Sequence, residues 1–256
     1  NSIKISASDV NLESLGYVID KAPFLSHLRN LCKQDENICV IDDAEIDIDD
    51  SDLPSKIIFP NSSDIVDFCQ LIVTDGANSK FAKKFNIPSK NINYEQTSFI
   101  FNAEYDSLEK SAVQIFTDKG VFAVLPGSGN KKSIVATIHN KFINHFQFES
   151  NNMNDKLLES QLLPHVKNLK NLKLIYKHPL NTSRLVNWLS DKALFLGNSS
   201  QLLHPFGAQG FNFSLDCIKK LDSEWKTASI NPKFDEHIIN IITKKRNELF
   251  YSIDLI

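Results

Sequence analysis

The sequence predicts an α/β domain, α+β overall, into which an antiparallel β-sheet is inserted. Two observations support this fold class. Short apolar strand-like runs end near residues 73 and 197, and a helical pattern follows the second of them, as in strand–helix units. Between them, from about residue 94 to 140, strand-like runs recur about every ten residues, which is typical of an antiparallel sheet. The 256 residues suffice for one large domain or two modest ones.

The N-terminal elements follow from apolar spacing. Residues 11–34 read as a loop and then a helix, because Pro23 suits a first helical turn and leucines recur at helical spacing after it. We expect β-type runs at 38–41 and 57–59. The run 65–73 ends in a continuous apolar strand of the kind that is buried on both faces.

The insert and the C-terminal part are predicted in the same way. Asp118-Lys119-Gly120 supplies a hairpin turn. We expect antiparallel strands at 97–105, 111–117, 121–126, 133–139 and 172–176, a buried strand at 193–197, and helices at 153–163, 209–222 and 234–250. In the last helix, Lys244-Lys245-Arg246 is expected on the solvated face, with contact to a lipid surface as the alternative.

Composition excludes several classes of protein. A hydrophobic fraction of 42% and a charged fraction of 23% are those of a globular domain, and a net charge of −3 predicts no nucleic-acid partner. The four cysteines form no C-x-x-C pair, so we expect no metal site and a cytoplasmic protein. No run reaches the roughly 18 apolar residues of a membrane span. An EF-hand starting at Asp47 is rejected, since Asp52 replaces its glycine and Ile58 its glutamate.

The segment 194–212 carries the strongest candidate site. A buried strand runs into Gly197, so the backbone can turn sharply at the edge where α/β sheets bind ligands, and Asn198 there suits a sugar hydroxyl. Gly207 and Gly210 flank a helix entry, whose free N–H groups and positive dipole end favour negative charge. An irregular loop with incidental glycines is the alternative.

A second candidate follows the strand that ends at Val73. Asp75 and Gly76 place a carboxylate and a flexible residue directly after it, from where a ribose hydroxyl or a pyrophosphate-side loop is within reach. The alternative is an ordinary Asp-Gly turn.

These segments resemble motifs of the flavin aromatic hydroxylases, in particular the ubiquinone-biosynthesis hydroxylases. That group has the pattern G-[DN]-A-A-x-x-x-H-P-x-x-G-Q-G-x-N. The matching residues are Gly197, Asn198, His204, Pro205, Gln209, Gly210 and Asn212. Ser199 and Ser200 replace the two alanines of the pattern. Ala208 stands where the pattern has the first glycine of G-Q-G, and the chain has its glycine one residue earlier, at Gly207.

Three more segments follow the family order. Residues 75–79 match D-G-A-x-S, the start of a family motif that is implicated in binding the reductant and that ends in an arginine. Ala82 occupies the place of that arginine in this chain, which weakens the expected contact with the reductant. Residues 14–20 are similar to L-G-Y-V-[VI]-[ED]. Residues 114–126 are similar to a hairpin of the family that ends in Pro126, close to the flavin ring in such folds.

The resemblance implies a domain order on an FAD/NAD(P)-binding, Rossmann-like fold, incomplete at its N-terminus. The parts are a substrate-domain strand at 1–10, FAD-binding parts at 11–90 and 181–222, an antiparallel substrate domain at 91–180 and a helical part at 223–256. Phenylalanines of the sheet (Phe99, Phe101, Phe116, Phe122) suit a greasy substrate, and sheet core needs them equally.

The resemblance also implies a function: an FAD-dependent monooxygenase that hydroxylates a polyprenylated phenol in ubiquinone biosynthesis through a C4a-hydroperoxyflavin. It would use FAD, O₂ and NAD(P)H or another donor, with partners from a ubiquinone-synthesis complex and peripheral contact at the inner membrane. The residues implied for the cofactor are Asp75, Gly76, Gly197, Asn198, Gly207, Ala208, Gln209, Gly210, Phe211 and Asn212. Pro126, His204 and Pro205 are pocket candidates, and no acid–base residue is assigned.

The sequence has no G-x-G-x-x-G, the turn that cradles the ADP phosphates in this family. We therefore expect a missing upstream segment and weak or no FAD retention by this chain. The alternative function is a non-catalytic, FAD-less scaffold or assembly subunit of a ubiquinone-synthesis complex.

Overall fold

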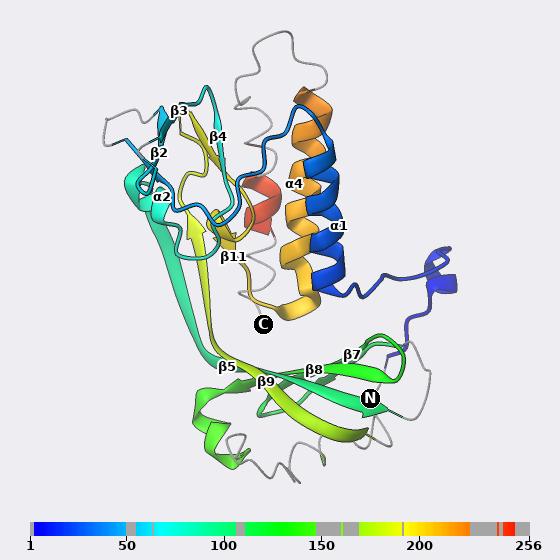
Figure 1. The fold of residues 1–256 in the computed structure, drawn as a ribbon. Coiled ribbons are helices and arrows are strands. Elements are labelled where there is room, and N and C mark those ends of the chain that lie inside the picture. The colour runs from blue at the N-terminus through cyan, green and yellow to red at the C-terminus, as the bar shows by residue number, and fades with distance from the viewer. Residues whose placement is uncertain are drawn as a thin grey trace. The chain divides into compact units, whose positions relative to one another are not determined.

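The structure, a computed structural model, divides the chain into two compact units (Figure 1). Unit 1 comprises Asn1–Ile41 and Glu95–Pro179, and unit 2 comprises Asp42–Tyr94 and Leu180–Ile256. The residues described are 3–49, 55–62, 64–105, 111–146, 160, 169–190, 192–225, 240 and 243–248. Each unit has its own apolar core.

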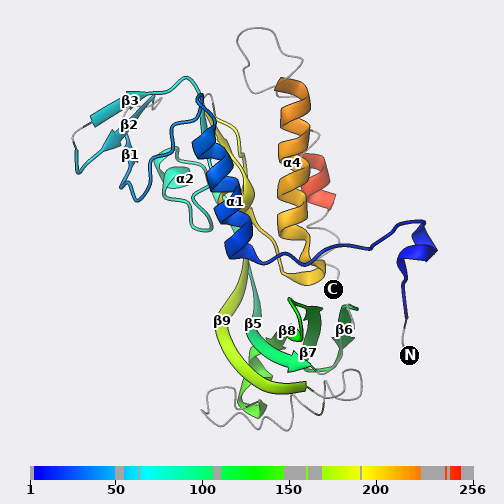
Figure 2. The same cartoon turned by 45° about the vertical axis from the view of Figure 1, so that its right-hand side comes forward.

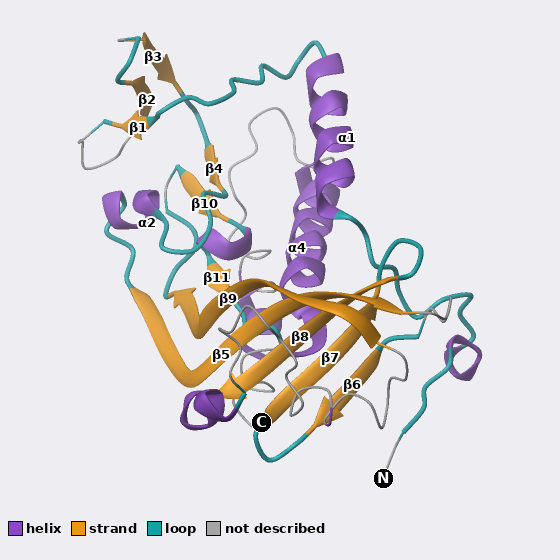
Figure 3. Ribbon diagram, turned by 60° about the horizontal axis from the view of Figure 1, so that its bottom comes forward, coloured by secondary structure: helices purple, strands orange, loops and turns teal. Residues whose placement is uncertain are grey.

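Unit 1 is built on an antiparallel sheet with the strand order β11-β9-β5-β8-β7-β6 (Figure 3). Its strands are β5 (Ser89–Tyr105), β6 (Val113–Phe116), β7 (Gly120–Pro126), β8 (Lys131–His139), β9 (Leu169–Leu185) and β11 (Gln201–Leu202). The long strands β5 and β9 continue into unit 2, which also contributes β11. The predicted antiparallel insert is therefore confirmed, and β9 is much longer than the expected strand at 172–176.

Alternation along the strands fills the core of this sheet. In β7 buried and half-buried residues alternate through GVFAVL, as expected of a strand with one covered face. Phe99, Phe101 and Phe122 are completely buried in this core, whereas Phe116 is exposed. Phe99, Phe101 and Phe122 thus serve as sheet core.

The predicted turn at 118–120 is confirmed. The Thr117 N–H donates to the Gly120 carbonyl over 2.9 Å, and β6 pairs with β7 in the register Phe116 with Val121. Gly120 lies against the neighbouring strand β8, where a Cβ atom would come within 2.0 Å of the Thr137 carbonyl oxygen. Only glycine therefore fits at this position.

The N-terminal residues differ from the expectation of a strand at 1–10. Among the residues described there, 7–10 form a 3-10 helix, η1 (Ala7–Val10), whose start is held by the Ser6 N–H donating to the Asp9 carboxylate over 2.7 Å. Ile3 and Ile5 are exposed, at 91% and 64%. This local carboxylate–amide contact offers the backbone an alternative to a strand.

Helix α1 (Lys21–Gln34) is present as predicted, with Pro23 in its first turn. This helix belongs to unit 1, together with the antiparallel sheet, whereas the sequence places residues 11–90 in the FAD-binding part. The Ser128 hydroxyl between β7 and β8 donates to the Asp20 carboxylate, directly before α1, over 2.6 Å. None of the α1 side chains is buried.

Unit 2 contains a small antiparallel sheet (Figure 2) and a parallel strand pair (Figure 3). The small sheet is β1 (Asp47–Ile48), β2 (Lys56–Phe59) and β3 (Asp64–Asp67), and the parallel pair is β4 (Leu71–Val73) with β10 (Ala193–Phe195). The labelled helices of unit 2 are α2 (Lys80–Lys84) and α4 (Gln209–Trp225), and its 3-10 turns are η3 (Gly197–Ser199) and η4 (Phe206–Ala208). The 3-10 turn η2 (Asn140–His145) belongs to unit 1.

Two strand predictions in this region are wrong in detail. Residues 38–41 form no strand, and Ile38 and Ile41 are exposed there. The run 65–73 is split, because β3 pairs with β2 while the Leu71 N–H donates to the Lys192 carbonyl beside β10. The chain changes sheets at Phe68–Gln70, and Ile72 is half exposed, so β4 is not buried on both faces.

The remaining helices agree with the sequence where they are described. Helix α4 confirms the helix expected at 209–222, and residues 243–248 confirm part of the one at 234–250. The helix expected at 153–163 lies outside the described residues except for residue 160. Among the helices of the described part, none is long and apolar enough to cross a membrane.

Candidate functional site

The candidate site is the edge where the parallel strands β4 and β10 end together. Val73 pairs with Phe195, and beyond them the Leu196 N–H donates to the Val73 carbonyl over 3.0 Å. The buried Ser199 hydroxyl lies 2.7 Å from both the Val73 and Leu196 carbonyl oxygens and can donate its one proton to either of them. The loops that follow the two strands are thereby fixed to each other, although they are more than a hundred residues apart in sequence.

The loop after β4 presents Asp75. Its Oδ2 accepts hydrogen bonds from the Ser79 hydroxyl and the Lys80 N–H, both over 3.0 Å. Ser79 in turn caps α2 by accepting from the Ala82 N–H over 3.0 Å. Gly76 has φ +90, which suits glycine, and the exposed Asp75 carboxylate is held at the strand edge by these contacts.

The loop after β10 turns at Gly197, which has φ +62. Its carbonyl accepts from the Ser200 N–H over 3.2 Å and from the Ser200 hydroxyl over 3.0 Å, which closes η3. Asn198 is exposed on this turn, while Ser199 and Ser200 are buried beneath it. The sequence motif predicts no role for the two serines, whereas in the structure their hydroxyls hold the turn.

Helix α4 begins close to this turn. It packs against η3, and a Cβ at Gly197 would lie 3.9 Å from the Ser214 hydroxyl on α4. The Ser214 hydroxyl donates to the Gly210 carbonyl over 2.9 Å. At the start of α4, Gln209, Phe211 and Asn212 are exposed and Gly210 is half-buried. The N–H groups at the start of this 17-residue helix lie at the positive end of its dipole and can donate to an anionic group.

The chain enters α4 through two successive left-handed residues. Gly207 has φ +67 and Ala208 has φ +52, and the Ala208 N–H donates to the Pro205 carbonyl over 3.0 Å. A non-glycine residue in this region is strained by roughly 1–2 kcal/mol. The strain falls on the position where the motif of the resembling family has glycine.

Ala208→Gly is expected to leave the free energy of unfolding unchanged or to raise it by up to about 1 kcal/mol, because relief of the left-handed strain offsets the greater unfolded-state entropy of glycine. Ala22→Gly, in α1 at ordinary helical angles, should instead lower it by about 0.5–1 kcal/mol. Urea unfolding of both variants gives the comparison. Equal losses would contradict the assignment of strain to Ala208.

His204 and Pro205 lie between β11 and η4. The His204 ring packs edge-on to the Tyr94 ring with centroids 4.8 Å apart, and burial lowers the pKa of His204 below its usual value. The imidazole is therefore neutral at pH 7 and packed against an aromatic neighbour. This placement favours a loop-shaping role for His204.

The lowered pKa makes a prediction about stability. The unfolded chain binds a proton at His204 more readily than the folded chain, so folding stability falls as the pH drops below about 6.5. We expect the slope of the unfolding free energy against pH to be shallower in His204→Gln between pH 5 and 7. His27→Gln, at an exposed position of α1, is the matched control. An unchanged slope in His204→Gln would refute the assignment.

The structure thus brings together most of the residues predicted for the cofactor. Asp75 and Gly76 follow β4, Gly197 and Asn198 follow β10, and the entry of α4 lies against η3. Pro126 belongs to unit 1, at the end of β7 opposite Lys132, so its predicted place near a flavin ring stays a prediction. Among the described residues there is no group of three or more potential metal ligands.

Comparisons with known proteins give similar proteins by sequence and by structure. No protein-family model matches the chain. It is 23% identical over 154 residues to the ubiquinone hydroxylase UbiL of Rhodospirillum rubrum, an alignment that covers 57% of this chain and 34% of that protein. It is 24% identical to the mitochondrial ubiquinone biosynthesis monooxygenase COQ6 of Dictyostelium discoideum, over 83% of this chain and 54% of that protein. The chain thus spans about a third to a half of the length of these relatives.

Solved structures agree in fold. The flavin-dependent halogenase BrvH from Brevundimonas sp. BAL3 superposes with a TM-score of 0.65 at 13% identity, over 93% of this chain and 47% of that one. PqsL of P. aeruginosa gives 0.65 at 11% identity, over 87% and 64%. The chain has the fold of flavin-dependent halogenases and monooxygenases, and its sequence is similar to hydroxylases and monooxygenases of ubiquinone metabolism.

Proposed function

We propose that this chain forms part of an FAD-dependent monooxygenase that hydroxylates a polyprenylated phenol in ubiquinone biosynthesis. The observation that carries the proposal is the convergence of three segments, distant in sequence, at one strand edge: the Asp75 loop, the Gly197 turn and the start of α4. This edge is where α/β folds bind nucleotide cofactors.

The residues present fit a flavin on this edge. Asp75 and Asn198 are exposed, and a Cβ at Gly76 or Gly210 would meet no atom within 4 Å, so the backbone is open to a ligand there. The Asp75 carboxylate can accept hydrogen bonds from ribityl or ribose hydroxyls, and Asn198 can donate or accept them. A bound flavin supplies the capacity to take electrons from NAD(P)H or another donor and to react with O₂.

The start of α4 has the second role in this proposal. Its N–H groups and the positive end of the helix dipole would stabilise negative charge on a flavin ring or phosphate. Gly207 lets the chain turn into this helix, and Gly210 keeps its first turn free of side-chain bulk. No acid–base residue is needed for this part, which agrees with the neutral, packed state of His204.

The substrate class rests on the relatives and not on a cavity in this chain. UbiL is a ubiquinone hydroxylase and COQ6 is a monooxygenase of ubiquinone biosynthesis, and we extend a polyprenylated phenol substrate to this protein from its similarity to them. Partners in a ubiquinone-synthesis complex and a peripheral contact with the inner membrane belong to the same proposal.

The proposal is tested by adding FAD to the purified protein and supplying NADPH, O₂ and a polyprenylated phenol. We expect a product heavier by one oxygen atom, and loss of this product in Asp75→Ala. Asp67→Ala, at an exposed carboxylate of β3, is the control and should keep the activity. A protein that cannot be reconstituted with FAD and yields no product would favour the alternative, a non-catalytic scaffold subunit.

A further inference from the structure

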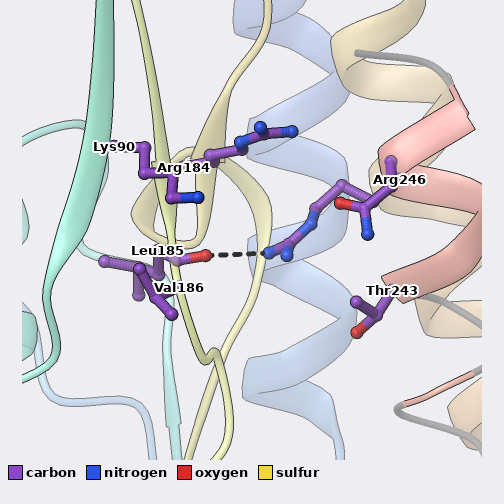
Figure 4. A pocket seen from close by; sticks show the side chains of 7 residues that line it. Lys90, Arg184, Leu185, Val186, Thr243 and Arg246 are labelled. Carbon is purple, nitrogen blue, oxygen red and sulfur yellow. Dashed lines mark hydrogen bonds between the residues drawn. The ribbon is translucent and has the colours of Figure 1, made fainter. Parts of the chain in front are cut away.

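A cavity of about 380 Å³ lies in unit 2, and none of the residues proposed to bind the flavin lines it (Figure 4). Its described polar side chains come from three segments: Lys90 from β5, Arg184 from β9, and Thr243, Arg246 and Asn247 from the helical residues 243–248. This volume is within the range of small-ligand sites, roughly 300–1,000 Å³.

Arg246 is the most unusual of these residues. The sequence predicts it on a solvated helix face, yet it is only 3% exposed. One guanidinium nitrogen donates to the Leu185 carbonyl over 3.1 Å, as the dashed line in Figure 4 shows, and the guanidinium lies 5.3 Å from the Trp188 ring. The Trp188 ring is itself held by its N–H donating to the Thr243 hydroxyl over 2.7 Å.

The buried guanidinium is incompletely satisfied. Its Nε is buried and has no hydrogen-bond partner in the structure. Leaving a buried donor of a charged group without a partner is costly, so such atoms in native proteins call for a ligand or water. The hydrogen bond to the Leu185 carbonyl satisfies only one terminal nitrogen of the guanidinium.

The charge balance of the cavity points the same way. Three cationic side chains line it, and none of its described lining residues is an aspartate or glutamate. Burial and the nearby Arg184 charge lower the pKa of Arg246 to about 10, so Arg246 is still charged at neutral pH. Burying such a charge is costly unless an opposite charge and hydrogen bonds accompany it. Figure 4 shows the Arg184 and Arg246 side chains extending into the space from opposite sides.

We propose that this cavity binds an oxyanion, the phosphate or carboxylate group of a small ligand, separately from the flavin edge. Arg246 and Arg184 supply planar forks of N–H donors that match oxyanions, and Lys90 adds a point charge at the exposed rim. The Thr243 hydroxyl accepts from Trp188, which leaves its own proton available to an anion.

The test is calorimetric titration of the whole chain at low ionic strength with inorganic phosphate, and separately with malonate as a dicarboxylate. We expect saturable binding of at least one of them. Arg184→Gln should weaken it about tenfold, from the loss of a charge-assisted contact, and Lys90→Gln about threefold, since this lysine is exposed. Lys56→Gln, at an exposed lysine of β2 outside the cavity, should leave the affinity unchanged.

Each outcome decides the proposal. Preference for phosphate or for malonate identifies the head group and supports the site in either case. Binding that persists unchanged in Arg184→Gln and Lys90→Gln would place the anion elsewhere, for example at the start of α4, and would overturn the proposal. Equal weakening by Lys56→Gln would show unspecific attraction and overturn it as well. The absence of saturable binding by either anion would do the same.

Discussion

Gly120→Ala is expected to lower the free energy of unfolding by about 3 kcal/mol or more. A methyl group at this position would lie 2.0 Å from the Thr137 carbonyl oxygen and 3.0 Å from the Ile138 Cα. Both atoms belong to the backbone of β8, which is paired with β5 and β7. Neither can move aside as a flexible side chain would, so the β7–β8 pairing itself must be displaced.

Urea unfolding, followed by circular dichroism, measures this effect. Gly16→Ala is the matched control, because a methyl group there would meet no atom within 4 Å. It should leave the stability unchanged or raise it slightly through the less flexible unfolded chain. If Gly120→Ala proved as stable as Gly16→Ala, the register between β7 and β8 described for unit 1 would be wrong.

Gly197→Val is expected to weaken FAD binding at least tenfold. Gly197 adopts φ +62, where a β-branched side chain is strongly disfavoured, and its carbonyl closes the turn that presents Asn198. A strain of about 1–3 kcal/mol is expected at such a position, and a displacement of this turn alters the proposed ligand edge directly. A loss of 1.4 kcal/mol in binding corresponds to about tenfold in affinity.

A matched variant separates strain from binding. Gly129→Val places the same side chain at φ +64 in a loop of unit 1, where a Cβ would meet no atom within 4 Å. Both variants should lose comparable stability, and only Gly197→Val should lose affinity for FAD in a fluorescence titration. Equal affinity in the two variants would remove Gly197 from the proposed site.

The sequence predicts the sheet of unit 1 well because its strands and turns are specified by residues close together in the sequence. Period-two alternation in β7 and the Asp118–Gly120 turn are readable within a few residues, and the structure confirms both. The two loops of the candidate site are predictable for another reason, since any residue that follows parallel strands lies at the same sheet edge. What local sequence does not show is that β4 and β10 are neighbours in the sheet, and the structure supplies this pairing.

Two of the failures have a common cause, which is that the partners of a segment lie far from it in the sequence. The run 65–73 is one apolar segment, yet it serves two different sheets. Lys244-Lys245-Arg246 reads as one charged face, yet Arg246 alone turns inward onto Trp188. At residues 1–10 the cause is local. The hydrogen bond between the Ser6 N–H and the Asp9 carboxylate begins a 3-10 helix where a strand is expected, and it needs no distant partner.

The central claim is that the β4–β10 edge and the start of α4 bind a flavin. Titration of the purified protein with FAD, followed by its visible absorption bands at about 375 and 450 nm, tests this most directly. We expect saturable, weak binding with shifted bands, unchanged in Gly129→Val and at least tenfold weaker in Gly197→Val. A protein that stays colourless and leaves the FAD spectrum unchanged at every concentration would contradict it.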